Sequence, residues 1–174
     1  MLTISAPHTP SVMLSKSSRT LGDMLRRRAE LTPSREAFFE HRDDRWRPTT
    51  WAQAYARSCR YAAGLRKLSL GRGDRIAILG PTQLRWALLD FAAQLLGLTS
   101  FGIYQQQTVE QIRYLLEHSE ARVILVGDEK ELPNVVAAAK DLPHVIAIIP
   151  WDEAVYARSK QLDPRLCSPT VLEC

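Results

Sequence analysis

Histidines and cysteines are the residues of this sequence best suited to catalysis or metal binding, and they are widely spaced. The histidines form no HxxxH or HExxH motif and the cysteines no CxxC pair, so neither set predicts a zinc site or a disulfide framework. These residues are His8, His41, His118, His144, Cys59, Cys167 and Cys174. We expect His118 in the last turn of a helix, where the helix dipole favours it, and Cys59 as a small buried side chain.

Phosphate-binding and nucleophile motifs are also missing from the sequence. It contains no GxxxxGK[ST] loop and no GxSxG turn. Gly71 and Gly73 precede an expected strand, whereas the glycines of the dinucleotide fingerprint GxGxxG follow one. The residues by themselves therefore predict no catalytic, cofactor-binding or metal-binding side chain.

Polar residues do follow the expected parallel strands, at the positions where doubly wound sheets bind ligands. Tyr104 and the glutamines at 105–107 could form hydrogen bonds with a ligand, although glutamines before a helix are equally explained by solvation of a loop. An anion could bind at a helix N-terminus that begins near Thr82 or Thr108. The other segments at this edge are 80–82, 127–128 and 150–152.

The stretch from Gly71 to Val126 has the pattern of a parallel sheet with crossover helices. Short apolar runs bounded by turn residues alternate with runs of helical period, and the run 123–126 lacks polar alternation, as in a strand covered on both faces. We predict an N-cap at Thr82, a helix stop at Gly97 and a capping box from Thr108 to Gln111. The expected order is strand 75–79, helix 82–97, strand 100–104, helix from 108, and strand 122–126.

The flanking sequence adds further elements of the same kind. Before the core we expect a helix from Thr20 to about Pro33, a hairpin with strands 37–40 and 45–47, and a helix from the Thr50 capping box to about 68. After it we expect a helix at 133–139, a strand at 144–149 and a helix at 152–162. The fold class is α/β with a doubly wound, mostly parallel sheet. The expected organisation is a disordered leader at 1–19, one subdomain at 20–162 and an irregular tail at 163–174.

Charge and hydropathy limit the partners and the location of the chain. No apolar run reaches the roughly 20 residues of a membrane span, and the cysteine usage fits a reducing cytoplasm. Residues 1–75 carry a net charge of +8 and the remainder −4. The arginines at 26–28, 42, 45 and 47 could attract nucleic acid or an anionic membrane surface, but they are more simply solvated side chains, so we expect no nucleic-acid partner and allow peripheral membrane contact.

Several of these motifs, in this order, resemble the amino-terminal part of the AMP-forming acyl-CoA synthetases. The matching pieces are the Thr50–Trp51 helix start, the segment 70–79, Gly97, the strand end 102–104, the helix start 108–116 and the segment 119–121. The segments GIYQ and EQIRYLLEHSEA are most similar to the long-chain fatty acyl branch of this family. Two departures are Val109, where the family often has proline, and the glutamines at 105–107.

The resemblance implies an adenylate-forming enzyme that joins a fatty acid to coenzyme A with ATP and Mg²⁺, through an acyl-adenylate. The family's phosphate loop, its adenine-site motif, its ribose-binding aspartate and its carboxy-terminal domain with the adenylation lysine would lie downstream of residue 174. We therefore expect an incomplete amino-terminal subdomain that binds no cofactor alone and is inactive unless a second chain supplies the remainder. The alternatives are an inactive remnant or interaction module that docks to a full-length synthetase, and a free-standing flavodoxin-like ligand-binding domain. The first interpretation, an incomplete subdomain completed by a second chain, predicts an unfinished sheet edge and an exposed apolar face that the partner would cover.

Overall fold

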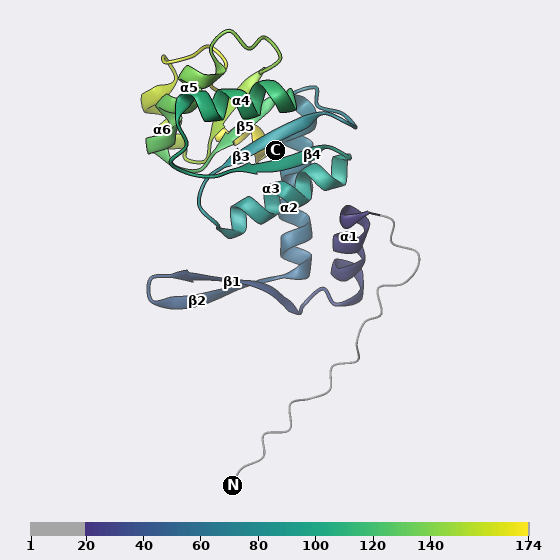
Figure 1. Ribbon diagram of the computed structural model, residues 1–174. Helices are drawn as coiled ribbons and strands as arrows, with labels where there is room; N and C mark the ends of the chain where they lie inside the picture. The colour runs from purple at the N-terminus through teal and green to yellow at the C-terminus, as the bar shows by residue number, and fades with distance from the viewer. Residues whose placement is uncertain (1–19, 174) are drawn as a thin grey trace.

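The computed structural model describes residues 20–173, in which four parallel strands form a single sheet. The strand order is β4-β3-β5-β6. The strands are β3 (Arg75–Leu79), β4 (Thr99–Ile103), β5 (Val123–Val126) and β6 (Ala147–Pro150). Helices cover both faces of this sheet (Figure 1), so the predicted doubly wound α/β fold is confirmed.

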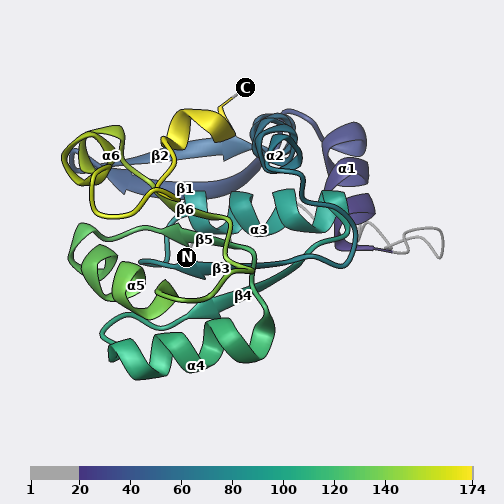
Figure 2. The ribbon, with the colours of Figure 1, turned by 90° about the horizontal axis from the view of Figure 1, so that it is seen from above.

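Alternation along the strands divides the core between the two faces of the sheet. Ile76 and Ile78 pack with α2 and α3, whereas Ala77 and Leu79 pack with α4 and α5. Successive strand residues point to opposite faces, so a strand buried on both sides is apolar throughout. The helices are α2 (Trp51–Lys67), α3 (Leu84–Leu96), α4 (Val109–Ser119), α5 (Leu132–Ala139) and α6 (Glu153–Ser159), with a short 3-10 helix, η1 (Glu129–Glu131), before α5. Seen from above, the two layers of helices lie on either side of the sheet (Figure 2).

The amino-terminal elements lie on the α2–α3 side of the molecule. Helix α1 (Leu21–Leu31) packs against α2 and α3, and the predicted hairpin forms a separate antiparallel pair, β1 (Glu36–Arg42) and β2 (Arg45–Thr50). Phe38 anchors the hairpin, because its ring lies 5.9 Å from the ring of Trp51 and 6.4 Å from that of Phe91. The rest of the hairpin extends away from the parallel sheet (Figure 1).

Local capping signals locate most of the helix ends correctly. Both predicted capping boxes are present, since Thr50 accepts from the backbone of Gln53 and Thr108 from that of Gln111, with the reciprocal bonds formed. Gly97 ends α3 in the left-handed conformation, with φ of 71°. The predicted N-cap at Thr82 is wrong: Gln83 takes that position in an extended conformation, and its carbonyl accepts from Trp86 at 3.0 Å.

Three further expectations need correction. Strand β6 begins at Ala147 and not at 144, because the chain up to Val145 forms a turn in which the Val145 N–H donates to the Leu142 carbonyl. Helix α6 ends at Ser159 and not at 162, since the following residues tighten into a three-residue turn. Cys59 is only half-buried.

The segment after α6 packs against the domain and adds a short 3-10 helix, η2 (Pro169–Leu172). Leu166 forms a parallel bridge with Ile148 at the outer side of β6, and Leu172 is fully buried. This packing requires a close approach to α2 at Gly64, where a β-carbon would lie 2.3 Å from the Val171 carbonyl oxygen. Residues 1–19, where the leader is expected, and Cys174 lie outside the described residues. Among residues 20–173 no helix combines the length and apolar character needed to span a bilayer.

Candidate functional site

The parallel strands end at one edge of the sheet, and the strand order marks one position along it. The chain passes from β3 to β4 on one side and then crosses to β5 on the other, so the switch point lies between β3 and β5. Ligands of doubly wound proteins bind in the crevice at this point. The loops that border it begin at Gly80 and at Gly127.

In this chain the crevice is filled by the side chain of Trp151. A β-carbon at Gly80 would lie 2.8 Å from the Gly127 Cα, and one at Gly127 would lie 2.8 Å from two carbons of the Trp151 ring. Trp151 is only 7% exposed. Gly127 is therefore needed because the indole packs directly on its backbone, and Gly80 because the Gly127 backbone lies against it.

Arg85 on α3 holds this tryptophan in place. Its Nη1 donates to the Trp151 carbonyl oxygen, and its guanidinium lies over the Tyr61 ring at 5.8 Å. The other side of the guanidinium approaches Glu173, with 4.0 Å between Nη2 and Oε1. Within residues 20–173, Arg85 Nε and Nη2 and Trp151 Nε1 are buried without a hydrogen-bond partner. The sequence analysis did not identify this cluster, because its members come from distant segments with no shared spacing.

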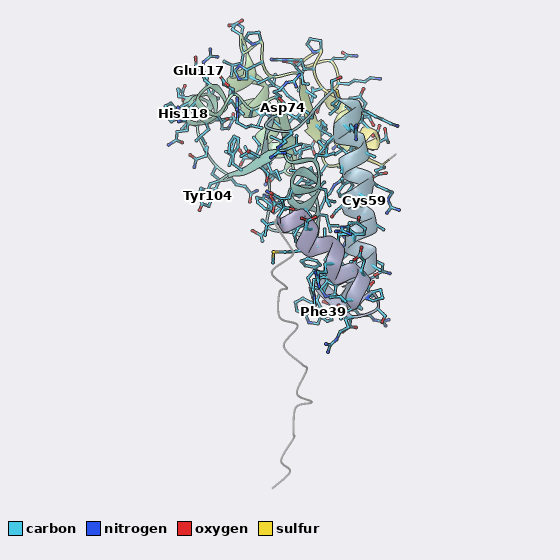
Figure 3. The ribbon with its side chains drawn as sticks, turned by 90° about the vertical axis from the view of Figure 1, so that its right-hand side faces the viewer. Phe39, Cys59, Asp74, Tyr104, Glu117 and His118 are labelled. Atoms are coloured by element: carbon cyan, nitrogen blue, oxygen red, sulfur yellow. The ribbon has the colours of Figure 1, made fainter. Side chains whose placement is uncertain are left out.

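The polar loop after β4 is stabilised by its own contacts. Gln105 donates to Asp128 Oδ2 at 3.3 Å, and the backbone N–H of Gln106 donates to Glu131 Oε1 at 2.8 Å. Glu131 is 6% exposed, whereas Tyr104 is 86% exposed and points into solvent (Figure 3). Two of the candidate glutamines therefore join this loop to the segment before α5, whereas the Tyr104 side chain is left exposed.

The two helix N-termini considered as anion sites differ in their capping. At α4 the capping box uses the backbone N–H groups of Thr108 and Gln111, and hydrogen bonds from its own backbone N–H and from Thr108 lower the pKa of Glu110. At α3 the N-cap, Gln83, forms no side-chain capping bond in the described part of the chain. The start of α3 therefore has no side-chain cap for its first-turn donors, whereas the start of α4 has one.

A groove of about 640 Å³ lies between the hairpin and this start of α3. Aromatic side chains of the hairpin form one wall, and the loop after β3 with the first turn of α3 forms the other. Its lining includes Phe38, Phe39, His41, Trp46, Thr82, Gln83 and Leu84. Sequence reasoning missed this groove, although exposed aromatic residues in a short hairpin are the signal that could have indicated it.

The histidines and cysteines remain dispersed in the structure. His118 stacks on Tyr114 with ring centroids 5.6 Å apart, His144 Nε2 lies 3.2 Å from the Leu116 carbonyl oxygen, and His41 packs against Trp46. Burial raises the pKa of the Cys167 thiol. Across residues 20–173, no group of histidine, cysteine or carboxylate side chains is arranged to hold a metal ion. His8 and Cys174 fall outside the described residues.

The amino-terminal arginines mostly contact groups within the chain. Arg26 bonds Glu30 at 3.0 Å and Arg47 bonds Asp43 at 2.8 Å, while the Arg28 guanidinium lies 5.0 Å from the centre of the Trp51 ring. Arg42 pairs with Glu40 at 3.2 Å. These pairs reduce the local positive charge that the sequence places in this half of the chain.

The sequence of this chain is similar to those of several known proteins. A family model described as "AMP-binding enzyme" matches residues 25–169. A long-chain fatty acid–CoA ligase of Thermus thermophilus is 33% identical over 144 residues, which are 83% of this chain and 26% of that enzyme. An uncharacterized protein of Mycobacterium tuberculosis is 30% identical over 111 residues, which are 64% of this chain and 61% of that protein.

The solved structures agree with these matches. The N-terminal domain of FACL13 from Mycobacterium tuberculosis superposes with a TM-score of 0.71 and 28% identity, over 83% of this chain and 36% of that one. The chain thus spans about a quarter of the Thermus ligase and about a third of this domain. The matched part includes the parallel sheet and the helices on both of its faces.

Proposed function

Because this chain belongs to the family of AMP-binding enzymes, we propose that it forms the amino-terminal part of a long-chain fatty acid–CoA ligase. The observation that carries the proposal is the continuous match to the Thermus ligase over 83% of the chain. The complete reaction in this proposal uses ATP to convert a fatty acid to its acyl-adenylate with release of pyrophosphate. Coenzyme A then displaces AMP to give the thioester.

We infer that residues 20–173 do not hold ATP and Mg²⁺ by themselves. The Trp151 ring packs on Gly127 at the switch point, the α4 capping box uses the Thr108 and Gln111 N–H groups, and no cluster of three or more histidine, cysteine or carboxylate side chains is arranged for a cation within this range. No glycine-rich phosphate loop occurs in the sequence. The proposed role of the chain is therefore structural: it supplies the sheet and helices against which a nucleotide-binding part packs.

In this proposal ligase activity requires a polypeptide that supplies the phosphate loop and the carboxy-terminal domain. The mycobacterial relative is a precedent for this segment as most of a short protein, since the match covers 61% of that protein's length. A reducing, cytoplasmic setting suits such an enzyme and is part of the proposal. The chain alone is expected to be inactive in adenylation.

The test is ATP–pyrophosphate exchange with a panel of fatty acids of different length. It is measured on this chain alone, on a chain that carries the remaining synthetase segments, and on the mixture. Exchange only in the mixture supports the proposal. Exchange by the 174-residue chain alone contradicts it, and a mixture without exchange indicates a folded interaction module that has no part in the ligase reaction.

The groove between the hairpin and α3 gives this experiment a matched pair of variants. Trp46→Ala alters an exposed groove residue, whereas Tyr114→Ala alters an aromatic residue of similar exposure on α4, at 64% against 68% for Trp46. If the groove contacts the nucleotide-binding part, Trp46→Ala lowers exchange by the mixture and Tyr114→Ala does not. Both variants keep the core intact, so circular dichroism should be unchanged.

A further inference from the structure

The two edges of the parallel sheet differ in how their backbone groups are used. At β6 the outer edge is covered, because the Ile148 N–H donates to the Arg165 carbonyl at 2.9 Å and its carbonyl accepts from Cys167 at 3.0 Å. At β4 the only neighbouring strand is β3, and within residues 20–173 no segment pairs with the outer side. Unpaired strand edges are templates for the addition of another strand.

The outward-facing groups of β4 can be assigned from its pairing with β3. The Thr99 N–H donates inward to the Asp74 carbonyl at 2.9 Å. Residues alternate along a parallel ladder, so Phe101 and Ile103 also bond inward, and the backbone groups of Ser100 and Gly102 face outward. The strand sequence TSFGI contains no proline and no charge, the devices that usually protect an edge.

These outward groups are symmetric about Phe101, so β4 is complementary to a second copy of itself. In an antiparallel pair centred on Phe101, Ser100 lies opposite Gly102 of the other copy and Gly102 opposite Ser100. Each is a pair of residues that exchanges two backbone hydrogen bonds. A two-fold axis at this point would join the two sheets into one continuous sheet of eight strands.

The helix above this edge presents a compatible surface. Arg113 of α4 turns toward α5, since its Nη1 donates to the Lys140 carbonyl at 2.6 Å. The opposite side of α4, on the open side of the sheet, therefore carries Gln111, Leu115 and His118. Figure 2 shows α4 beside β4, and Figure 3 shows Tyr104 and His118 on the same side of the molecule.

This side of α4 suits contact with its own copy. It holds a groove of about 340 Å³ with a mostly apolar lining that includes Tyr114 and Leu115. Gln107 and Gln111 also line this groove, and Glu110 is its one charged lining residue. Leu115 lies near the middle of this stripe, where it would meet the same region of the other copy.

We propose that the chain forms a two-fold dimer by antiparallel pairing of β4 strands, with the α4 helices in contact beside the axis. This inference does not depend on the proposed ligase role, because the β4 edge lies apart from the groove between the hairpin and α3. The dimer leaves that groove open in both copies.

The first test is the mass of the 174-residue chain by sedimentation velocity over a range of concentrations. A concentration-dependent dimer is expected. Thr99→Lys places a charge on the exposed start of β4 and should raise the dissociation constant by about tenfold or more. Thr82→Lys makes the same change in an exposed loop away from β4 and should leave it unchanged.

A second pair of variants separates the β4 edge from the hairpin as the contact. Tyr114→Lys should weaken the dimer, whereas Phe39→Lys, at a residue 53% exposed on β1, should not. A chain that is monomeric at every concentration overturns the proposal. A dimer weakened by Phe39→Lys but not by Thr99→Lys also overturns it, because the hairpin would then be the interface.

Hydrogen exchange of the unmodified chain tests the register directly. The Ser100 and Gly102 amides should exchange more slowly as the dimer forms, while the Thr99 amide, already bonded to Asp74, should change little. A dimer in which Ser100 and Gly102 remain unprotected contradicts strand pairing. Protection of these amides only when a chain carrying the remaining synthetase segments is added would show a different occupant of the edge, and would also contradict the proposal.

Discussion

At Gly64 in α2, helix propensity and packing predict opposite changes in the free energy of unfolding when glycine is replaced by alanine. In an ordinary helix interior, replacement of glycine by alanine stabilises the fold by about 1 kcal/mol. At Gly64 the new β-carbon would lie 2.3 Å from the Val171 carbonyl oxygen and 2.5 Å from the Leu172 Cα. These are backbone atoms of η2, so the whole segment has to move away from α2.

The cost of that movement can be worked from what the segment buries. Leu172 is fully buried against α2, and complete exposure of a leucine side chain costs about 1.5–3 kcal/mol, with a further contribution from any cavity left behind. After subtraction of the propensity gain, Gly64→Ala should lower the free energy of unfolding by about 1–2 kcal/mol. For a domain of this size the melting temperature should fall by roughly 2–8 °C.

Urea denaturation followed by circular dichroism measures this free energy, and Ala63→Gly is the matched control. Ala63 is exposed on the same helix, so its replacement reports helix propensity alone and should cost about 1 kcal/mol. Leu172→Ala should cost more by itself, and the double variant Gly64→Ala/Leu172→Ala should cost less than the sum, because both act on one segment. A Gly64→Ala protein as stable as the unmodified chain would refute the close packing of η2 on α2.

Three other substitutions test separate features of the fold. Thr108→Ala removes the α4 capping box and should cost about 1 kcal/mol, whereas Thr82→Ala should cost nothing measurable, because Thr82 does not cap α3; urea titration compares the two. Gly127→Ala should be destabilising in the unmodified chain and less so in a Trp151→Ala background, where the Gly80 Cα at 3.0 Å is the close contact that remains; a double-mutant cycle by thermal unfolding measures the difference. Asp163→Asn should cost about 1–3 kcal/mol at pH 7, because Asp163 bonds Arg165 at 2.6 Å in a mostly buried pair. A hydrogen bond from Arg165 lowers the pKa of Asp163 in the folded state. The difference in unfolding free energy between the two proteins should therefore be complete above the ordinary carboxyl pKa of about 3.9, and should disappear as the pH falls through the lower pKa of folded Asp163.

The fold was largely predictable because its signals are local. The capping boxes at Thr50 and Thr108 each involve two residues three apart, and β3 was predicted with the bounds that the structure has. The errors occur where distant contacts decide the outcome. The sequence shows only lost periodicity after residue 162, yet Leu166 pairs with β6 and Leu172 enters the core, since Gly64 admits the segment.

The sequence predicted which loops meet at the expected ligand-binding edge of the sheet, but not which side chains lie between them. The sequence placed the loops after β3, β4 and β5 together, as parallel topology requires. It did not show that Trp151 occupies the space between two of them, because an indole after a strand has no periodic signature. Nor did it show that Glu131 accepts from the backbone of Gln106, a contact between loops 25 residues apart.

These contacts show which side chains occupy the carboxyl-terminal edge of the sheet in this chain. The Trp151 ring packs on Gly127, Glu131 accepts from the backbone of the loop after β4, and Thr108 caps α4. The start of α3 is different, since it has no side-chain cap and faces the groove beside the hairpin. If a nucleotide-binding part packs against this chain, that groove offers it both uncapped backbone donors and an aromatic wall, which is why the Trp46→Ala variant is the more informative member of its pair.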